Sequence, residues 1–289
     1  MQRVKIITER LASMSYKFAK KHGIALLPVS IMHKGDTIQD DNDEKANDFL
    51  QRLQHMEEIP TTGAPPLGQM INFFQDAMKD LETAIYITPS VKLSSIHDHG
   101  LTVAKKLKDK GKDIRVFDSG TTVSMQGMYA YEANLLAKQG KDIDSILNHL
   151  EKLKENRQIV EYGVLETLKF LEKNGRIGKA KAWIAGLFSF KPIITAKDGI
   201  LEPIARVRTN AQGLDMIVDK IREDMKRTNS SKIKVMYDYG LDDEYVRSEV
   251  APKIKQEFDA EVISFNQIST VIACHMGPEI WGVCVKMEK

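Results

Sequence analysis

The chain has 289 residues, 42% hydrophobic and 28% charged, which is the balance of a folded protein with one large domain or two ordinary ones. Its 42 Lys and Arg residues against 40 Asp and Glu leave a net charge of +2, and this argues against nucleic-acid binding, which usually requires a basic stripe. The two cysteines, Cys274 and Cys284, exclude a disulfide framework. No segment approaches the roughly 18 uncharged apolar residues of a transmembrane helix, and the N-terminus lacks a signal-peptide pattern. We therefore expect a cytoplasmic protein.

The first half of the chain alternates strand-like and helix-like segments. Strands are expected over residues 4–8, 24–32, 83–88 and 113–118, and helices over residues 11–21, 43–56, 67–79, 95–110 and 124–138. Residues 59–66 are expected to form a loop, because three prolines and a glycine break a helix there. Strands separated by helices imply right-handed crossovers and a parallel sheet.

The pattern changes after an amphipathic helix over residues 143–153, which we expect to join two lobes, residues 1–155 and 156–289. Helices are then expected over residues 165–174, 181–188, 210–226 and 242–258, and strands over residues 191–195, 200–207, 232–239, 261–267 and 281–287. A hairpin among these strands favours a mixed sheet. The predicted fold class is α/β, with a parallel-sheet N-terminal lobe and a mixed-sheet C-terminal lobe.

The common enzyme signatures are absent from the sequence. It contains no phosphate-binding glycine loop, no His-Glu-x-x-His and no Gly-x-Ser-x-Gly. His97 and His99 are two apart on an expected helix, so they point about 200° apart and cannot share a metal. Cys274 and His275 are neighbours on what reads as a strand, where their side chains face opposite sides, so Cys274 is expected to be a core residue. We expect no catalytic residue, no metal and no cofactor.

Four short segments stand out although each has an ordinary structural explanation by itself. They are Pro60-Thr61-Thr62, Lys92-Leu93-Ser94-Ser95, Gly175-Arg176-Ile177 and His275-Met276-Gly277-Pro278. Three further stretches occur in the same order along the chain, Phe117-Asp118-Ser119, Phe190-Lys191-Pro192-Ile193-Ile194 and Arg206-Val207-Arg208. Taken together, over nearly the whole chain, these segments resemble the DegV family of bacterial fatty-acid-binding proteins.

The resemblance implies one long-chain fatty acid held between the two lobes, with no reaction catalysed by the chain itself. It implies that Thr62 and Ser94 hold the carboxylate, with His275 nearby and Arg176 as a further contact. Ser95 and Met276 occupy adjoining positions of the same lipid site. Members of this kind present the acyl chain to a separate fatty acid kinase, which makes an acyl phosphate. We expect Arg206 and Arg208, on one side of a strand, to contact such a partner.

The residue types suit this chemistry. A carboxylate withdrawn from water needs hydrogen-bond donors, which hydroxyl groups and a helix N-terminus supply. Each buried methylene contributes roughly 0.8 kcal/mol, so the tail should dominate affinity. Candidate channel residues are Leu165, Leu168, Leu171, Ile177, Ile184, Leu187, Phe188 and Ile193.

The sequence departs from the family pattern at several positions. Glu9 follows the first strand in place of an Asp-Ser pair, Ser95 and Glu279 replace glycines, and Met276 replaces a threonine. Asn210-Ala211-Gln212 stands where basic residues are usual. Two alternatives therefore stay open. One is a divergent member that binds another lipid or none and acts as a scaffold or partner protein. The other is a phosphotransferase-like enzyme using Asp118, Ser119 and His275.

Overall fold

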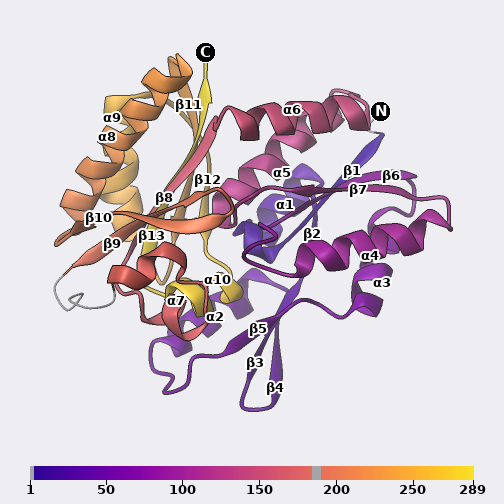
Figure 1. Ribbon diagram of the computed structural model, residues 1–289, viewed down its shortest axis with the longest axis horizontal. Helices are drawn as coiled ribbons and strands as arrows, with labels where there is room; N and C mark the ends of the chain where they lie inside the picture. The colour runs from indigo at the N-terminus through magenta and orange to yellow at the C-terminus, as the bar shows by residue number, and fades with distance from the viewer. Residues whose placement is uncertain (1–2, 184–189) are drawn as a thin grey trace.

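The structure is a computed structural model that describes residues 3–183 and 190–289 (Figure 1). Two α/β lobes lie side by side, and a small third sheet projects below them in this view. The predicted fold class is confirmed, because the sheet of the first lobe is parallel and that of the second is mixed.

The first lobe is built on a four-stranded sheet with the order β2-β1-β6-β7, in which all neighbouring strands are parallel. The strands are β1 (Val4–Glu9), β2 (Ala25–Leu27), β6 (Thr83–Thr88) and β7 (Asp113–Asp118). β6 is an inner strand, so the loop after it opens at the middle of the sheet edge where ligands of α/β folds bind.

Helices cover both faces of this sheet. They are α1 (Tyr16–His22), α3 (Leu67–Ala77), α4 (Ile96–Lys108), α5 (Val123–Lys138) and α6 (Ile143–Glu155). α3 and α4 share a core with Tyr86 of β6, whereas α1, α5 and α6 pack on the opposite face. The apolar stripe of α6 that marks it as amphipathic in the sequence is buried at Ile146, Leu150 and Leu153.

The second lobe is built on a six-stranded sheet with the order β10-β9-β8-β13-β11-β12. Its strands are β8 (Ile159–Leu165), β9 (Lys191–Lys197), β10 (Ile200–Val207), β11 (Lys232–Tyr239), β12 (Asp259–Gln267) and β13 (Ile280–Glu288). One face is covered by α8 (Asn210–Thr228), the π turn η3 (Val246–Val250) and α9 (Ala251–Glu257). The other face turns toward α5 and the first lobe. Side chains on that face therefore border the space between the lobes.

The third sheet is antiparallel, with the order β4-β3-β5. Its strands are β3 (Val29–His33), β4 (Asp36–Asp40) and β5 (Thr61–Gly63). Beside it lie α2 (Asp43–Leu53) and, from the second half of the chain, α7 (Lys169–Lys173) and α10 (Thr270–Met276). α10 contacts α2, α7, β3 and β5, so elements from both ends of the sequence meet here (Figure 1).

Proline explains two differences from the predicted strands and helices. The strand expected over residues 24–32 is divided into β2 and β3 at Pro28, which has no N–H for a strand ladder. The helix expected over residues 242–258 is interrupted by η3 and is regular again at α9, where Pro252 lies in the first turn.

Long-range pairing explains two others. The loop expected over residues 59–66 contains β5, because Thr62 pairs with Ile31 of β3. The helix expected over residues 165–174 shrinks to α7, since pairing with β13 extends β8 to Leu165.

The helix predicted over residues 181–188 lies largely outside the described residues; the 3-10 turn η2 (Gly178–Trp183) precedes that part of the chain. The division between residues 155 and 156 stays a prediction, with α6 ending at Glu155 and β8 beginning at Ile159. Within residues 3–183 and 190–289, none of the helices combines the length and apolarity needed to cross a bilayer.

Candidate functional site

A hydrogen bond between Thr62 and His275 closes one side of the candidate site. Thr62 Oγ1 and His275 Nε2 lie 2.9 Å apart. Thr62 is fixed by the pairing of β5 with β3, and His275 lies near the C-terminal end of α10. The contact therefore joins the three-stranded sheet to a helix from the end of the chain.

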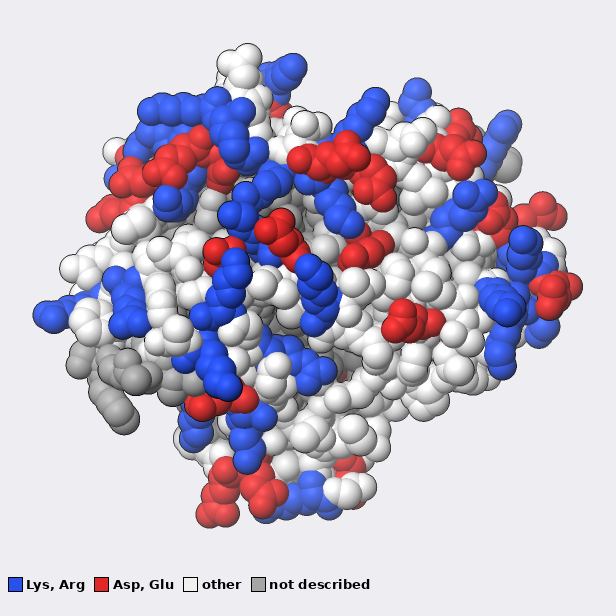
Figure 2. Space-filling model, viewed as in Figure 1, with Lys and Arg blue, Asp and Glu red and all other residues white. Residues whose placement is uncertain are grey.

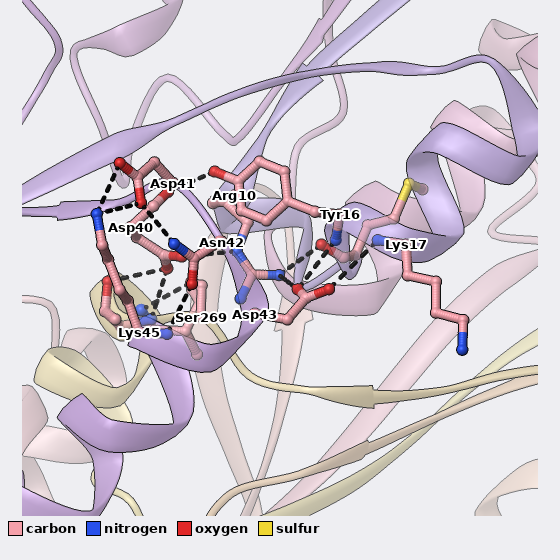
Figure 3. A network of polar contacts seen from close by, with 12 residues as sticks. Arg10, Tyr16, Lys17, Asp40, Asp41, Asn42, Asp43, Lys45 and Ser269 are labelled. Atoms are coloured by element: carbon pink, nitrogen blue, oxygen red, sulfur yellow. Dashed lines mark hydrogen bonds and ion pairs between the residues drawn. The ribbon is translucent and has the colours of Figure 1, made fainter.

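A buried ion pair holds α10 in this position (Figure 3). Arg10 Nε donates to Asp40 Oδ1 at 3.1 Å, and the two side chains are 1% and 0% exposed. The other Asp40 oxygen, Oδ2, accepts from the backbone N–H of Thr270 at 3.0 Å and from its hydroxyl at 2.9 Å. Ser269 caps the same helix by accepting from the N–H of Ile272 at 3.2 Å. Asp40 thus ties the first turn of α10 to the residue that follows β1, and this sets where His275 lies.

Ser94 and Ser95 lie in the loop between β6 and α4. Ser94 Oγ accepts from the N–H of Ile96 at 3.3 Å, and the Ser95 side chain makes no capping hydrogen bond to the helix. The first N–H groups of a helix lack intrahelical partners and favour an anion. The loop is anchored to the second lobe, because Ser90 Oγ donates to Gly199 O at 2.7 Å and Lys92 Nζ to Asp198 O at 2.8 Å. The start of α4 is therefore held against the other lobe.

A cavity of about 90 Å³ lies between these elements and brings together all six predicted lipid-site residues. Its lining comprises Leu11, Thr62, Gly63, Ala64, Leu93, Ser94, Ser95, Ile96, Thr122, Leu171, Arg176, Leu201, Val271, Ile272, His275 and Met276. Arg176 lies at its outer rim, where it donates to the carbonyl oxygens of Leu93 and Asn174 at 3.3 and 2.8 Å. We call this space the head cavity.

A second cavity of about 30 Å³ adjoins the head cavity, and Thr122, Leu201 and Met276 line both. Its remaining lining is Thr121, Val123, Glu161, Gly163, Ile194, Thr195, Ala196, Asp238, Ile280 and Gly282. Met276, 5% exposed, therefore lies at the junction of the two spaces. We call the second space the inner cavity.

The predicted channel residues are placed in three ways. Leu171 lines the head cavity, and Leu165, Leu168 and Ile177 belong to the core cluster around both cavities. The prediction for Ile193 is wrong, because it packs on the face of the sheet covered by α8, and its neighbour Ile194 lines the inner cavity instead. Ile184, Leu187 and Phe188 lie outside the described residues.

Burial determines the charge state of His275. Desolvation, assisted by the positive charge of Arg176, lowers the pKa of His275 to about 4. The imidazole is therefore neutral at physiological pH, when one ring nitrogen donates and the other accepts. His275 stands on a helix and not on the strand inferred from the sequence. Its neighbour Cys274 is fully buried, as expected of a core residue, and burial raises the pKa of that thiol.

Arg206 and Arg208 lie away from both cavities. Both are exposed while Val207 between them is buried, which is the alternation expected of a strand. The guanidinium of Arg206 lies 4.4 Å from the ring centre of Trp183, and that of Arg208 lies 5.2 Å from the ring centre of Phe190. These contacts place both arginines on one surface strip, formed by the end of β10 and Arg208 directly after it.

The residues of the phosphotransferase alternative do not meet. Asp118 Oδ1 accepts from the N–H of Gly120 at 2.9 Å, and Ser119 Oγ donates to Thr88 O at 2.7 Å. Neither residue lines the cavity that contains His275. Glu161 and Asp238, by contrast, line the inner cavity and were missed from the sequence. Each is an acidic residue within a mostly apolar, strand-like segment, and this pattern could have identified both as candidates.

These features define a two-lobed α/β protein with a partly polar cavity between its lobes. The model of the DegV family, described as uncharacterised, matches residues 3–288, and the chain belongs to this family. A DegV domain-containing protein of Halalkalibacterium halodurans is 27% identical over 100% of both chains. Protein DegV of Bacillus subtilis is 25% identical over 97% of this chain and 98% of its own.

Solved structures share the fold. A fatty-acid-binding DegV family protein of Thermus thermophilus has a TM-score of 0.89 and 22% identity, covering 99% of each chain. A stearic-acid-binding protein of Eubacterium ventriosum also has a TM-score of 0.89, with 20% identity over 99% of this chain and 98% of that one.

Proposed function

We propose that this chain binds a single long-chain fatty acid, with the carboxylate in the head cavity and the acyl chain passing Met276 into the inner cavity. The observation that carries the proposal is the convergence of Thr62, Ser94 and His275 on one cavity from three distant parts of the sequence. Fatty-acid binding by a DegV family protein of Thermus thermophilus, and by a protein of the same fold in Eubacterium ventriosum, supports it.

The polar groups can satisfy a carboxylate without a buried counter-charge. A neutral His275 that donates from Nε2 to Thr62 Oγ1 leaves the Thr62 hydroxyl hydrogen free for the ligand. Ser94 and the first N–H groups of α4 supply further donors. Arg176 at the rim adds a positive charge that favours the anion.

The acyl chain supplies most of the affinity in this proposal, at roughly 0.8 kcal/mol for each buried methylene. Pockets that hold ligands of this size usually measure roughly 300–1,000 Å³, more than the 90 and 30 Å³ of the two cavities. Binding therefore requires the side chains at the junction, Met276 and Leu201, to move apart.

The chain in this proposal is a carrier and performs no chemistry on the lipid. A separate fatty acid kinase would phosphorylate the carboxylate, and the strip formed by Arg206 and Arg208 is the proposed contact surface for it. On the face shown in Figure 2, Lys and Arg side chains are interspersed with Asp and Glu. A cytoplasmic location, as predicted from the sequence, suits such a carrier.

Native mass spectrometry of the purified protein tests the proposal. We expect an added mass equal to one long-chain fatty acid, which solvent extraction then releases and identifies. Recovery of no acyl chain, together with no binding of added oleate or palmitate, would reject lipid binding and favour the scaffold alternative.

A further inference from the structure

The inner cavity exists because two neighbouring strands carry glycine at the same level. Gly163 of β8 is the register partner of Gly282 of β13, and Gly282 is in turn the partner of Asp238 on β11. Side chains that would otherwise fill the space above the sheet are missing at both glycines. Asp238 stands at the end of this row and lines the cavity.

A second acidic side chain, Glu161, stands beside Asp238 in the lining. It precedes Gly163 by two residues on β8 and so projects from the same face of the sheet. The two carboxyl groups are hydrogen-bonding neighbours. An otherwise mostly apolar cavity therefore contains a pair of acids.

The surrounding residues satisfy this acid pair only in part. Ser124 Oγ donates to Asp238 Oδ1 at 2.6 Å and in turn accepts from Asn266 Nδ2 at 2.9 Å. The N–H of Met125 donates to Glu161 Oε2 at 2.8 Å. Asp238 is 1% exposed, yet its second oxygen, Oδ2, receives no hydrogen bond from an amide or hydroxyl donor of the described residues.

The acid pair keeps a proton near neutral pH. Burial raises the pKa of Asp238 to about 7, and burial together with the negative charge of Asp238 raises the pKa of Glu161 well above its usual value. That proton is held between the two carboxyl groups, and the remaining lone pairs of the carboxylate can accept further hydrogen bonds. A plain hydrocarbon chain against the pair would donate none, and burying an unsatisfied polar atom is unfavourable. A hydroxyl group on the chain would donate to Asp238 Oδ2, which receives no amide or hydroxyl donor from the described residues.

We propose that the inner cavity selects an acyl chain that bears a hydroxyl group, which hydrogen-bonds to Asp238 and Glu161. This inference rests on the proposed binding of a fatty acid and names the class of acid. It also predicts a positional preference. The head cavity fixes the carboxylate and the acid pair is fixed on the sheet, so only hydroxyl positions near one point of the chain can reach it.

Isothermal titration calorimetry on delipidated wild-type protein tests the inference. The probes are stearic acid and a series of monohydroxystearic acids that differ only in the position of the hydroxyl. We expect one position, or two adjacent positions, to bind roughly tenfold more tightly than stearic acid, a factor that corresponds to about 1.4 kcal/mol. Hydroxy acids that all bind equally to stearic acid, or more weakly, would overturn the inference while leaving fatty-acid binding intact. If no acid in the series binds, the proposed function itself fails.

Two variants assign the preference to the acid pair. Asp238→Ala should bring the affinity ratio between the preferred hydroxy acid and stearic acid close to one, and a ratio unchanged from wild type would contradict the assignment.

Gly163→Ala keeps the pair but adds a methyl group to the cavity wall. That methyl would meet Ile194 Cγ1 and Ile280 Cδ1 at 3.8 Å, an ordinary contact, so folding should be preserved. It should weaken binding of the preferred hydroxy acid, and undiminished binding would contradict placement of the chain here. If Asp238→Ala does not fold, the wild-type titration series and Gly163→Ala still test whether the inner cavity selects a hydroxy acid.

Discussion

Thr62 Oγ1 lies 2.9 Å from His275 Nε2 although 213 positions separate the two residues in sequence. The contact depends on elements that are each too short to fold alone, the three-residue strand β5 and the seven-residue helix α10. It survives only because β3 pairs with β5 and Asp40 anchors α10. The proposed head-group site is therefore a product of the tertiary structure.

Removing the Thr62 hydroxyl should weaken fatty-acid binding. Thr62→Val keeps the shape of the side chain but loses the donor, and a hydrogen bond to a charged group contributes roughly 1.5–3 kcal/mol. We expect stearate to bind roughly ten- to a hundredfold more weakly in calorimetric titrations. Thr61→Val is the matched control, because Thr61 is on the same strand, is exposed and does not line the head cavity. Equal loss in both variants would argue against a direct contact.

Asp40 should be far more important for stability than its neighbour Asp41. Asp40→Ala removes the nearer, fully buried partner of the Arg10 charge, leaving only Asp43 at 3.9 Å, and it removes two hydrogen bonds from Thr270. Breaking a buried ion pair in this way costs about 3–5 kcal/mol of unfolding free energy. Asp41→Ala removes an exposed pair with Lys45 and an exposed hydrogen bond from Asn42, and it should cost under about 1 kcal/mol. Urea unfolding of both variants measures the difference, and similar midpoints would contradict this role of Asp40.

Glu9 should make the protein less stable as the pH rises toward neutrality. Burial raises the pKa of Glu9 to about 7, opposed in part by its hydrogen bond from Gln126. Between the usual Glu value of 4.5 and about 7, the unfolded chain is ionised there while the folded chain retains the proton. Folding stability contributed by this group is therefore complete below about pH 4.5 and declines as the pH rises, by up to about 3 kcal/mol.

The variant Glu9→Gln should lose that pH dependence. Its stability relative to wild type, from urea unfolding at several pH values, should increase between about pH 4.5 and about pH 7.5. Glu57→Gln, at an exposed position, provides the control, and its stability should depend on pH as that of the wild type does. A difference between Glu9→Gln and wild type that stays constant with pH would show that Glu9 ionises normally.

Replacing Arg206 and Arg208 together by Ala should leave lipid binding unchanged, because neither side chain lines a cavity. Acyl-phosphate formation by the cognate fatty acid kinase should fall by an order of magnitude or more if the strip is its contact surface, as for interface arginines. Arg52→Ala is a suitable control, since Arg52 is exposed on α2. Full kinase activity with the double variant would exclude the strip as the contact.

The sequence predicted the main sheets because their signals are local. The alternation of strands with amphipathic helices defines the parallel sheet, and the apolar stripe of α6 marks a helix on its own. β5 was not predictable, because three residues after Pro60 become a strand only when β3 is beside them. The helix α10 was not predicted for the same reason. A helix of seven residues forms there only with Ser269 and Asp40 at its start.

The candidate site was predictable in a different way. Thr62, Ser94 and His275 were chosen through a resemblance, and no periodicity or spacing in the sequence says that they share a cavity. Glu161 and Asp238 show the limit of that approach. Their proximity follows from the register of β8, β13 and β11, which a sequence without its strand pairing does not reveal.

A crystal structure of the protein with bound stearic acid would test the central proposal most directly. We predict that the carboxylate oxygens lie within about 3.2 Å of at least two of the side chains of Thr62, Ser94 and His275, with the chain passing Met276. A carboxylate more than roughly 10 Å from these side chains, a gap that a single water bridge cannot span, would contradict the proposed site.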